Sequence, residues 1–73
     1  MTRVSKPTIS GRLVSLRESK DLSQDKLAKM AGIDRKTINR IENGHFSPSI
    51  DTLFRICKAL KVKPADFING VQV

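Results

Sequence analysis

The sequence predicts an all-α protein, a compact bundle of five short helices. Four glycines and three prolines divide its 73 residues into short segments. Within each segment the apolar residues recur every three or four positions, which is the period of a helix, and no segment shows the sustained alternation of a strand. A chain of this length has room for one hydrophobic core, so we expect a single domain.

The first predicted helix covers residues 9–20, and Thr8 stands where a capping hydroxyl is expected. Three apolar residues share one face of this helix: Ile9, Leu13 and Leu16. The residues before it, 1–8, are expected to form a short basic arm rather than a targeting sequence.

The second and third predicted helices follow one another closely. Ser23 suits the cap of the second helix. Gly32 ends it, because glycine readily takes the left-handed conformation that closes a helix. Asp34 suits the cap of the third helix, which runs over residues 35–43 and stops before Gly44.

The last two predicted helices lie beyond a loop at residues 45–48. Ser49 suits the cap of the fourth helix, and Pro64 suits the first turn of the short fifth helix. Their apolar residues keep helical spacing: Ile50, Leu53, Ile56, Leu60, Phe67 and Ile68. With the apolar residues of the other helices, Met30 among them, they are expected to form one core.

Residues 24–43 carry the pattern of a helix-turn-helix, in which two helices cross steeply around a short turn. The two backbones approach closely at one point, where the small side chain of Ala28 fits. Gly32 supplies the positive φ of the turn. Four larger apolar side chains are expected to bury the inner faces: Leu27, Ile33, Ile38 and Ile41. So many coincident positions make the motif a strong signal.

The outward face of the third predicted helix is rich in hydrogen-bond donors. Three cations and two amides fall within one arc, without a carboxylate: Arg35, Lys36, Asn39, Arg40 and Asn43. The helix is about 13 Å long, and a DNA major groove is about 12 Å wide. Because 14 Lys and Arg against 7 Asp and Glu leave the chain with a charge of +7, DNA readout is favoured over the alternative of a merely solvated helix face.

Other function classes lack the residues they need. No residues have the spacing of a catalytic site or of a phosphate-binding glycine loop, so an enzyme is not expected. His45 has no partner ligands in the sequence, so neither a metal nor another cofactor is expected. Cys57 has no second cysteine to pair with and is expected to be a small buried residue in a reducing cytoplasm. The apolar runs are too short for a membrane span.

Residues 9–68 resemble the phage-repressor/Cro-type helix-turn-helix family, also called XRE. The matching strings cover nearly the whole chain: Leu16-Arg17-Glu18, Leu22-Ser23-Gln24, Leu27-Ala28, Gly32-Ile33, Ile38-Asn39-Arg40-Ile41-Glu42-Asn43-Gly44, Pro48-Ser49 and Ala59-Leu60-Lys61-Val62. The resemblance implies a bacterial or phage-encoded regulator whose third helix lies in the major groove. It divides the chain into an arm (1–8), a DNA-binding domain (9–68) that contains the motif, and a C-terminal tail (69–73).

The resemblance also implies roles for individual residues. The residues expected to read bases are Arg35, Lys36, Asn39 and Arg40. The residues expected to contact the DNA backbone are Ser23, Gln24, Thr37, Asn43, His45 and Ser47. Arg17 and Glu42 are expected to form a structural ion pair between the first and third helices. The expected dimer surface, whose members suit the core equally well, consists of Phe46, Ile50, Phe67, Val71 and Val73.

Together these observations predict a sequence-specific transcriptional regulator that binds a pseudo-palindromic operator in double-stranded DNA as a homodimer. A small phage or plasmid repressor fits this profile, as does the controller of a restriction-modification cassette. One alternative is an antitoxin that binds a toxin protein and autoregulates its operon, and another is non-specific coating of nucleic acid.

For two groups of cations the sequence leaves open whether they contact DNA or are only solvated. Arg12 and the basic arm either contact phosphates or are solvated. The cations of the fourth helix and the residues after it are expected to be a solvated surface rather than a second DNA contact: Arg55, Lys58, Lys61 and Lys63.

Overall fold

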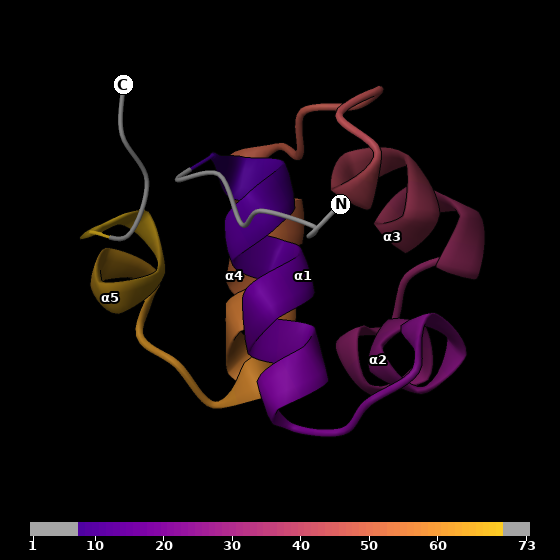
Figure 1. The fold of residues 1–73 in the computed structure, drawn as a ribbon, viewed down its shortest axis with the longest axis horizontal. Coiled ribbons are helices and arrows are strands. Elements are labelled where there is room, and N and C mark those ends of the chain that lie inside the picture. Colours follow the sequence, from indigo (N-terminus) through magenta and orange to yellow (C-terminus); the bar gives the residue numbers. More distant parts are fainter. Residues whose placement is uncertain (1–7, 70–73) are drawn as a thin grey trace, which may run out of the picture.

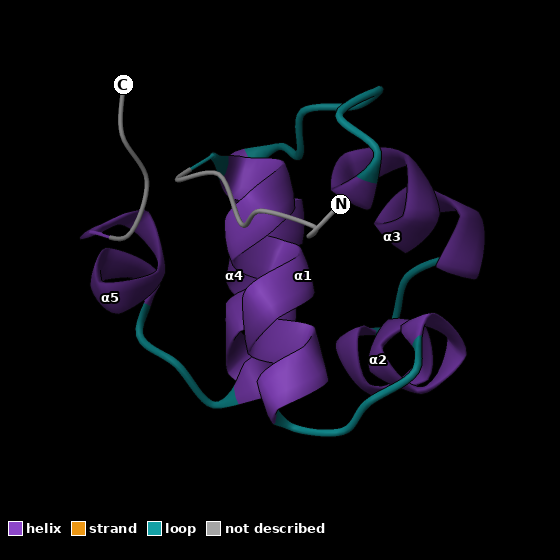
Figure 2. Cartoon of the chain, viewed as in Figure 1, coloured by secondary structure: helices purple, strands orange, loops and turns teal. Residues whose placement is uncertain are grey.

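Helices make up most of residues 8–69, the part of the chain that the computed structural model describes (Figure 1). They are α1 (Ile9–Ser19), α2 (Gln24–Ala31), α3 (Arg35–Glu42), α4 (Ile50–Leu60) and α5 (Pro64–Asn69). The described residues contain no strand (Figure 2). The predicted all-α class is therefore confirmed, and each predicted helix lies at its expected place.

Side-chain hydroxyls cap three of the helices, as their positions predict. Each accepts a hydrogen bond from a backbone amide three residues further on: Thr8 from Gly11 at 3.1 Å, Ser23 from Lys26 at 3.0 Å and Ser49 from Thr52 at 3.1 Å. Gly32 ends α2 with a φ of 71°, in the left-handed region. Asp34 occupies the N-cap position of α3, but its side chain makes no capping hydrogen bond.

The helices enclose one core. Helix α2 contacts α3 and α4, α3 also contacts α1, and α5 contacts α4. In Figure 1 the α2–α3 pair lies on one side of α1 and α4, and α5 lies on the other. The buried apolar side chains come from all five helices: Leu13, Leu27, Ala28, Ala31, Ile38, Ile41, Leu53, Ile56, Cys57, Leu60 and Phe67. Burial also raises the pKa of the Cys57 thiol, which keeps it in the neutral form.

Three residues predicted to be in the core are instead exposed. The exposed fraction is 46% for Met30, 68% for Ile50 and 50% for Ile68. Met30 lies about 110° around α2 from the middle of the buried face that Leu27 and Ala28 form. Ile50 is the first residue of α4, and Ile68 lies about 100° around α5 from the buried Phe67. Helical spacing alone does not show where a neighbouring helix stops.

Arg12 closes the C-terminal end of α5. Its Nε donates to the carbonyl oxygen of Phe67 at 3.1 Å, and its Nη2 donates to that of Asp66 at 2.9 Å. These carbonyls belong to the last turn of a helix, where intrahelical partners are missing. The sequence did not indicate these partners of Arg12, because they lie 54 and 55 residues away.

Candidate nucleic-acid interface

Three cationic side chains of α3 face away from the core. Arg35, Lys36 and Arg40 are exposed, whereas Ile38 and Ile41 are buried. The helical period of about 100° per residue separates the two sets onto opposite faces. Burial of the isoleucines therefore positions a row of cations that offers only hydrogen-bond donors to a ligand.

The carboxylate of α3 is turned inward, against α1. The Glu42 side chain is 5% exposed and forms a bidentate ion pair with Arg17, with Nε to Oε2 at 2.6 Å and Nη2 to Oε1 at 3.1 Å. The remaining nitrogen, Nη1, donates to the Leu22 carbonyl oxygen at 2.7 Å. The hydrogen bond from Arg17 to Glu42 raises the pKa of the guanidinium above its already high ordinary value. The pair joins α1 to α3 and keeps a negative charge away from the cationic row.

Three side-chain amides lead from this ion pair toward the surface. Gln24 Nε2 donates to Glu42 Oε1 at 2.9 Å, and Asn39 Nδ2 donates to Gln24 Oε1 at 3.2 Å. Asn43 Nδ2 then donates to Asn39 Oδ1 at 3.1 Å. Asn39, which was expected to read bases, is half-buried and uses both ends of its amide in this chain. The link between Gln24 and Asn39 has no signal in the sequence, because it joins two helices across 15 residues.

The residues expected at the DNA backbone lie at the start of α2, along α3 and in the loop after it. Their exposure differs. Gln24 and Thr37 are half-buried, and four others are exposed: Ser23, Asn43, His45 and Ser47. The backbone amide of His45 donates to the Arg40 carbonyl oxygen at 2.8 Å, which ties the start of the loop to α3.

Only two of the five expected dimer residues lie on the described surface. Phe46 is 45% exposed and Ile50 is 68% exposed. Phe67 is 1% exposed and belongs to the core, which corrects its assignment to the dimer surface. Its side chain is buried because α5 turns that face toward the rest of the bundle. Val71 and Val73 lie outside the described residues.

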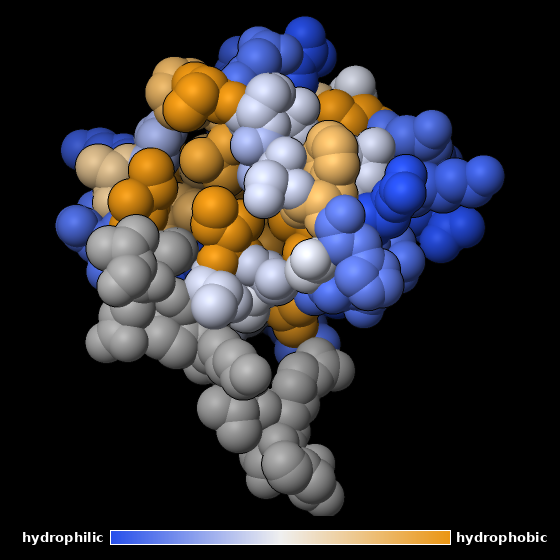
Figure 3. All heavy atoms as spheres, turned by 90° about the horizontal axis from the view of Figure 1, so that it is seen from above, coloured by the Kyte–Doolittle hydropathy of each residue, from blue (hydrophilic) through white to orange (hydrophobic). Residues whose placement is uncertain are grey.

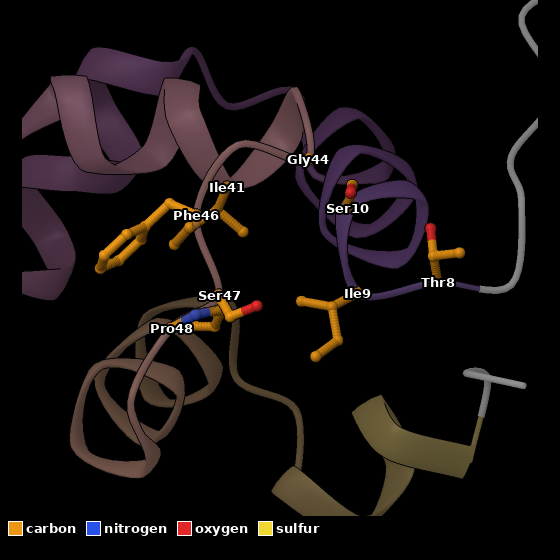
Figure 4. Close-up of a pocket in the computed structure, with 8 residues that line it drawn as sticks. All are labelled: Thr8, Ile9, Ser10, Ile41, Gly44, Phe46, Ser47 and Pro48. Carbon is orange, nitrogen blue, oxygen red and sulfur yellow. The ribbon is translucent and has the colours of Figure 1, made fainter. Parts of the chain in front are cut away.

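Other apolar residues lie near Phe46 and near Ile50. Phe46 and Pro48 line a hollow of about 250 Å³ together with Ile9 and Ile41 (Figure 4). Phe54, one turn after Ile50 on α4, is 52% exposed and was missed by the sequence analysis. Figure 3 shows apolar residues gathered beside hydrophilic ones on the face that is uppermost in Figure 1.

The cations of α4 and of the residues just after it belong to a different part of the surface. Arg55 donates to the Asp51 carboxylate at 3.0 Å in an exposed pair, and Lys58, Lys61 and Lys63 are also exposed. Exposure fits both a solvated surface and a DNA contact, so the solvated role of these cations stays a prediction. Within residues 8–69, His, Cys, Asp and Glu side chains never gather in the groups of three that a metal ion needs. No helix in the same range has the length and hydropathy to cross a bilayer.

Comparison with known proteins places this arrangement among DNA-binding regulators. A family model described as "Helix-turn-helix" matches residues 13–67. The uncharacterized HTH-type transcriptional regulator YgzD of Bacillus subtilis is 34% identical over 58 residues, which cover 80% of this chain and 88% of YgzD. The antitoxin PezA of Streptococcus pneumoniae is 35% identical over 61 residues, which cover 84% of this chain but only 39% of PezA.

Solved structures have the same fold. The restriction-modification controller protein C.AhdI from Aeromonas hydrophila superposes with a TM-score of 0.79 and 32% identity, covering 81% of this chain and 89% of C.AhdI. The P22 c2 repressor in complex with a synthetic operator superposes with a TM-score of 0.78 and 25% identity, covering 86% of this chain and 96% of the repressor.

Proposed function

The chain belongs to the helix-turn-helix family of DNA-binding transcriptional regulators, and from this premise we propose that it reads a pseudo-palindromic operator in double-stranded DNA as a homodimer. The observation that carries the proposal is the exposed row of Arg35, Lys36 and Arg40 opposite the buried isoleucines of α3. Residues 9–68 would form the DNA-binding domain, acting on DNA in the cytoplasm.

Helix α3 enters the major groove in this proposal. Arginine and lysine donate to guanine O6 and N7, so Arg35, Lys36 and Arg40 are the residues that read bases. Asn39 was also expected to read bases. Its amide is committed to Gln24 and Asn43, which favours a positioning role over direct readout.

Contacts to phosphates set the position of α3 in the groove. The start of α2, at Ser23 and Gln24, would bind one phosphate, because a helix N-terminus carries unpaired N–H groups and a partial positive charge. Thr37 on α3 would approach the same strand. Asn43, His45 and Ser47 would contact the backbone further along. These contacts predict that affinity falls steeply with rising salt concentration, as counterions are released from the DNA.

A homodimer would present two α3 helices about 34–36 Å apart, one for each half of the operator. The exposed apolar residues Phe46, Ile50 and Phe54 support such a contact, because a self-complementary surface needs an apolar patch that the monomer leaves uncovered.

Substitution of Ile50 by lysine is expected to weaken this dimer at least about tenfold, because a charged side chain would be desolvated in the interface. Sedimentation equilibrium measures the change. The matched control is Met30→Lys, which places the same charge on an exposed apolar residue of α2 and should leave the dimer unchanged. Equal dissociation constants for Ile50→Lys and the wild type would exclude this surface.

Selection of bound sites from a random duplex library tests the proposed function. The expected result is one enriched motif with two inverted halves spaced by about one helical turn. Recovery of unrelated duplexes with equal affinity would support non-specific coating of nucleic acid instead.

Substitution of Arg40 by alanine is expected to weaken binding to the selected operator by about 1–3 kcal/mol and to relax the preference at one base pair. Binding to random duplex should change much less. Lys58→Ala is the control, since it removes an exposed cation from α4. Fluorescence anisotropy on both duplexes measures the difference. An equal loss on both duplexes would make Arg40 a phosphate contact.

The similarity to PezA favours a second candidate, an antitoxin whose DNA binding serves autoregulation. The chain matches only 39% of that protein, so the proposal of a repressor or a restriction-modification controller has priority. Purification from the native cells separates the two: a stoichiometric complex that inhibits a co-purified toxic protein would support the antitoxin.

A further inference from the structure

We propose that Glu42 sets the direction of the hydrogen bonds that run through the amides of Gln24, Asn39 and Asn43, and thereby which donor and acceptor Asn43 presents to DNA. Glu42 itself is turned away from the surface, so it acts as a positioning residue. This inference rests on the proposed function, since it concerns the same DNA-facing side of α2 and α3.

The chain of amides begins at an atom that can only accept. The Glu42 carboxylate is nearly buried and is held in place by Arg17. An ionised carboxylate has no hydrogen to donate, so Gln24 must turn its Nε2 toward Oε1, where the distance is 2.9 Å. The reverse orientation of Gln24 would place two oxygen acceptors against each other in a partly buried site.

The orientation of Gln24 decides the next two amides. Its Oε1 faces Asn39, which must therefore donate with Nδ2, at 3.2 Å. The Oδ1 of Asn39 is left facing Asn43, which donates in turn at 3.1 Å. Each amide has one donor end and one acceptor end, so one choice at Glu42 determines all three. Hydrogen bonds in such a chain also polarise and strengthen one another.

Asn43 is the last amide of the chain, and its orientation decides which groups the chain presents at the surface. It is exposed, and it offers a carbonyl oxygen and the second hydrogen of its NH₂ group. That pair matches the donor and acceptor on an adenine edge, and the hydrogen alone suits a phosphate oxygen. In the reverse direction Asn43 would offer both hydrogens of its NH₂ group, and its oxygen would have one lone pair already used by Asn39. Glu42 therefore selects between two surface patterns without any contact to DNA.

The first test compares Glu42→Gln with Asp25→Asn, using the operator selected by the wild-type protein. Both variants remove one negative charge, and Asp25 lies on the exposed side of α2. General electrostatics predicts that both bind DNA at least as tightly as the wild type. The proposal predicts that Glu42→Gln binds about tenfold more weakly, because a glutamine at position 42 permits both directions. A Glu42→Gln variant that binds as Asp25→Asn does would overturn the proposal.

The second test asks whether the effect travels through Asn39. In an Asn39→Ala background the chain is interrupted, so Glu42→Gln should cost less than about threefold instead of about tenfold. A purely structural role for Glu42 predicts the same loss in both backgrounds. Circular dichroism must first show each variant folded at the assay temperature. If Glu42→Gln is unfolded, Gln24→Ala and Asn43→Ala replace it, and additive losses for that pair would overturn the proposal.

The outcomes separate this inference from the proposed function. If the wild-type protein selects no motif, that result contradicts the proposed function itself. If the wild-type protein selects a motif and the Glu42→Gln variant binds it with full affinity, only the proposed role of Glu42 is contradicted.

Discussion

Substitution of Arg17 by alanine is expected to lower the free energy of unfolding by about 3–5 kcal/mol, because it leaves a buried carboxylate without its counter-ion. The Glu42 side chain is 5% exposed and receives two hydrogen bonds from Arg17. A domain of this size has a total stability of about 4–11 kcal/mol. Urea unfolding followed by circular dichroism is expected to show a largely unfolded or strongly destabilised variant.

Arg55→Ala is the matched control for Arg17→Ala. Arg55 also pairs with a carboxylate, Asp51, but both side chains are more than half exposed, so its loss should change stability by less than about 1 kcal/mol. Similar small losses for both variants would mean that the Arg17–Glu42 pair contributes no more than a surface pair. Because folding raises the pKa of Arg17, the protonated guanidinium stabilises the fold. This stabilisation is fully present below the ordinary arginine pKa and is lost only as the pH rises through the raised pKa. The contribution of Arg17 should therefore not vary with pH near neutrality.

Substitution of Phe67 by alanine is expected to destabilise the protein by about 3–5 kcal/mol, because it removes a large buried side chain and leaves a cavity beneath α5. Phe67 is 1% exposed, and it is the buried residue of α5. Thermal unfolding at several protein concentrations measures the effect. A loss of stability that persists at every concentration is expected for a core residue.

The neighbouring substitution, Ile68→Ala, provides the control. Ile68 is 50% exposed, so its truncation should change stability by less than about 1 kcal/mol. The result that would contradict the core assignment is a Phe67→Ala variant that keeps its unfolding free energy but dissociates as a dimer. That outcome would return Phe67 to the dimer surface.

The local features of this protein can be predicted from its sequence because they depend on residues close together in the chain. A capping hydroxyl meets an amide three residues away, as Thr8, Ser23 and Ser49 do. Apolar spacing of three and four residues likewise turns Ile38 and Ile41 inward and leaves Arg35, Lys36 and Arg40 outside. The helices, the turn at Gly32 and the cationic row were all predicted on this basis.

Other features depend on residues that only folding brings together. Arg12 caps a helix that lies 55 residues further along the chain, and no pattern near Arg12 indicates that contact. Helical spacing does not distinguish Phe67, Ile50 and Ile68, and it predicts each of them equally as a core residue or an interface residue. Only the place where α5 meets the bundle buries the first and leaves the other two exposed.

The sequence by itself therefore determined the five helices, their ends and the charge of the outward face of α3, because hydrogen bonds and side-chain periodicity within one helix span only a few residues. The tertiary structure alone decided that Gln24 donates to Glu42 and accepts from Asn39. Gln24 reaches Asn39 and Glu42 because α2 crosses α3, and a crossing of two helices is a property of the packed core as a whole.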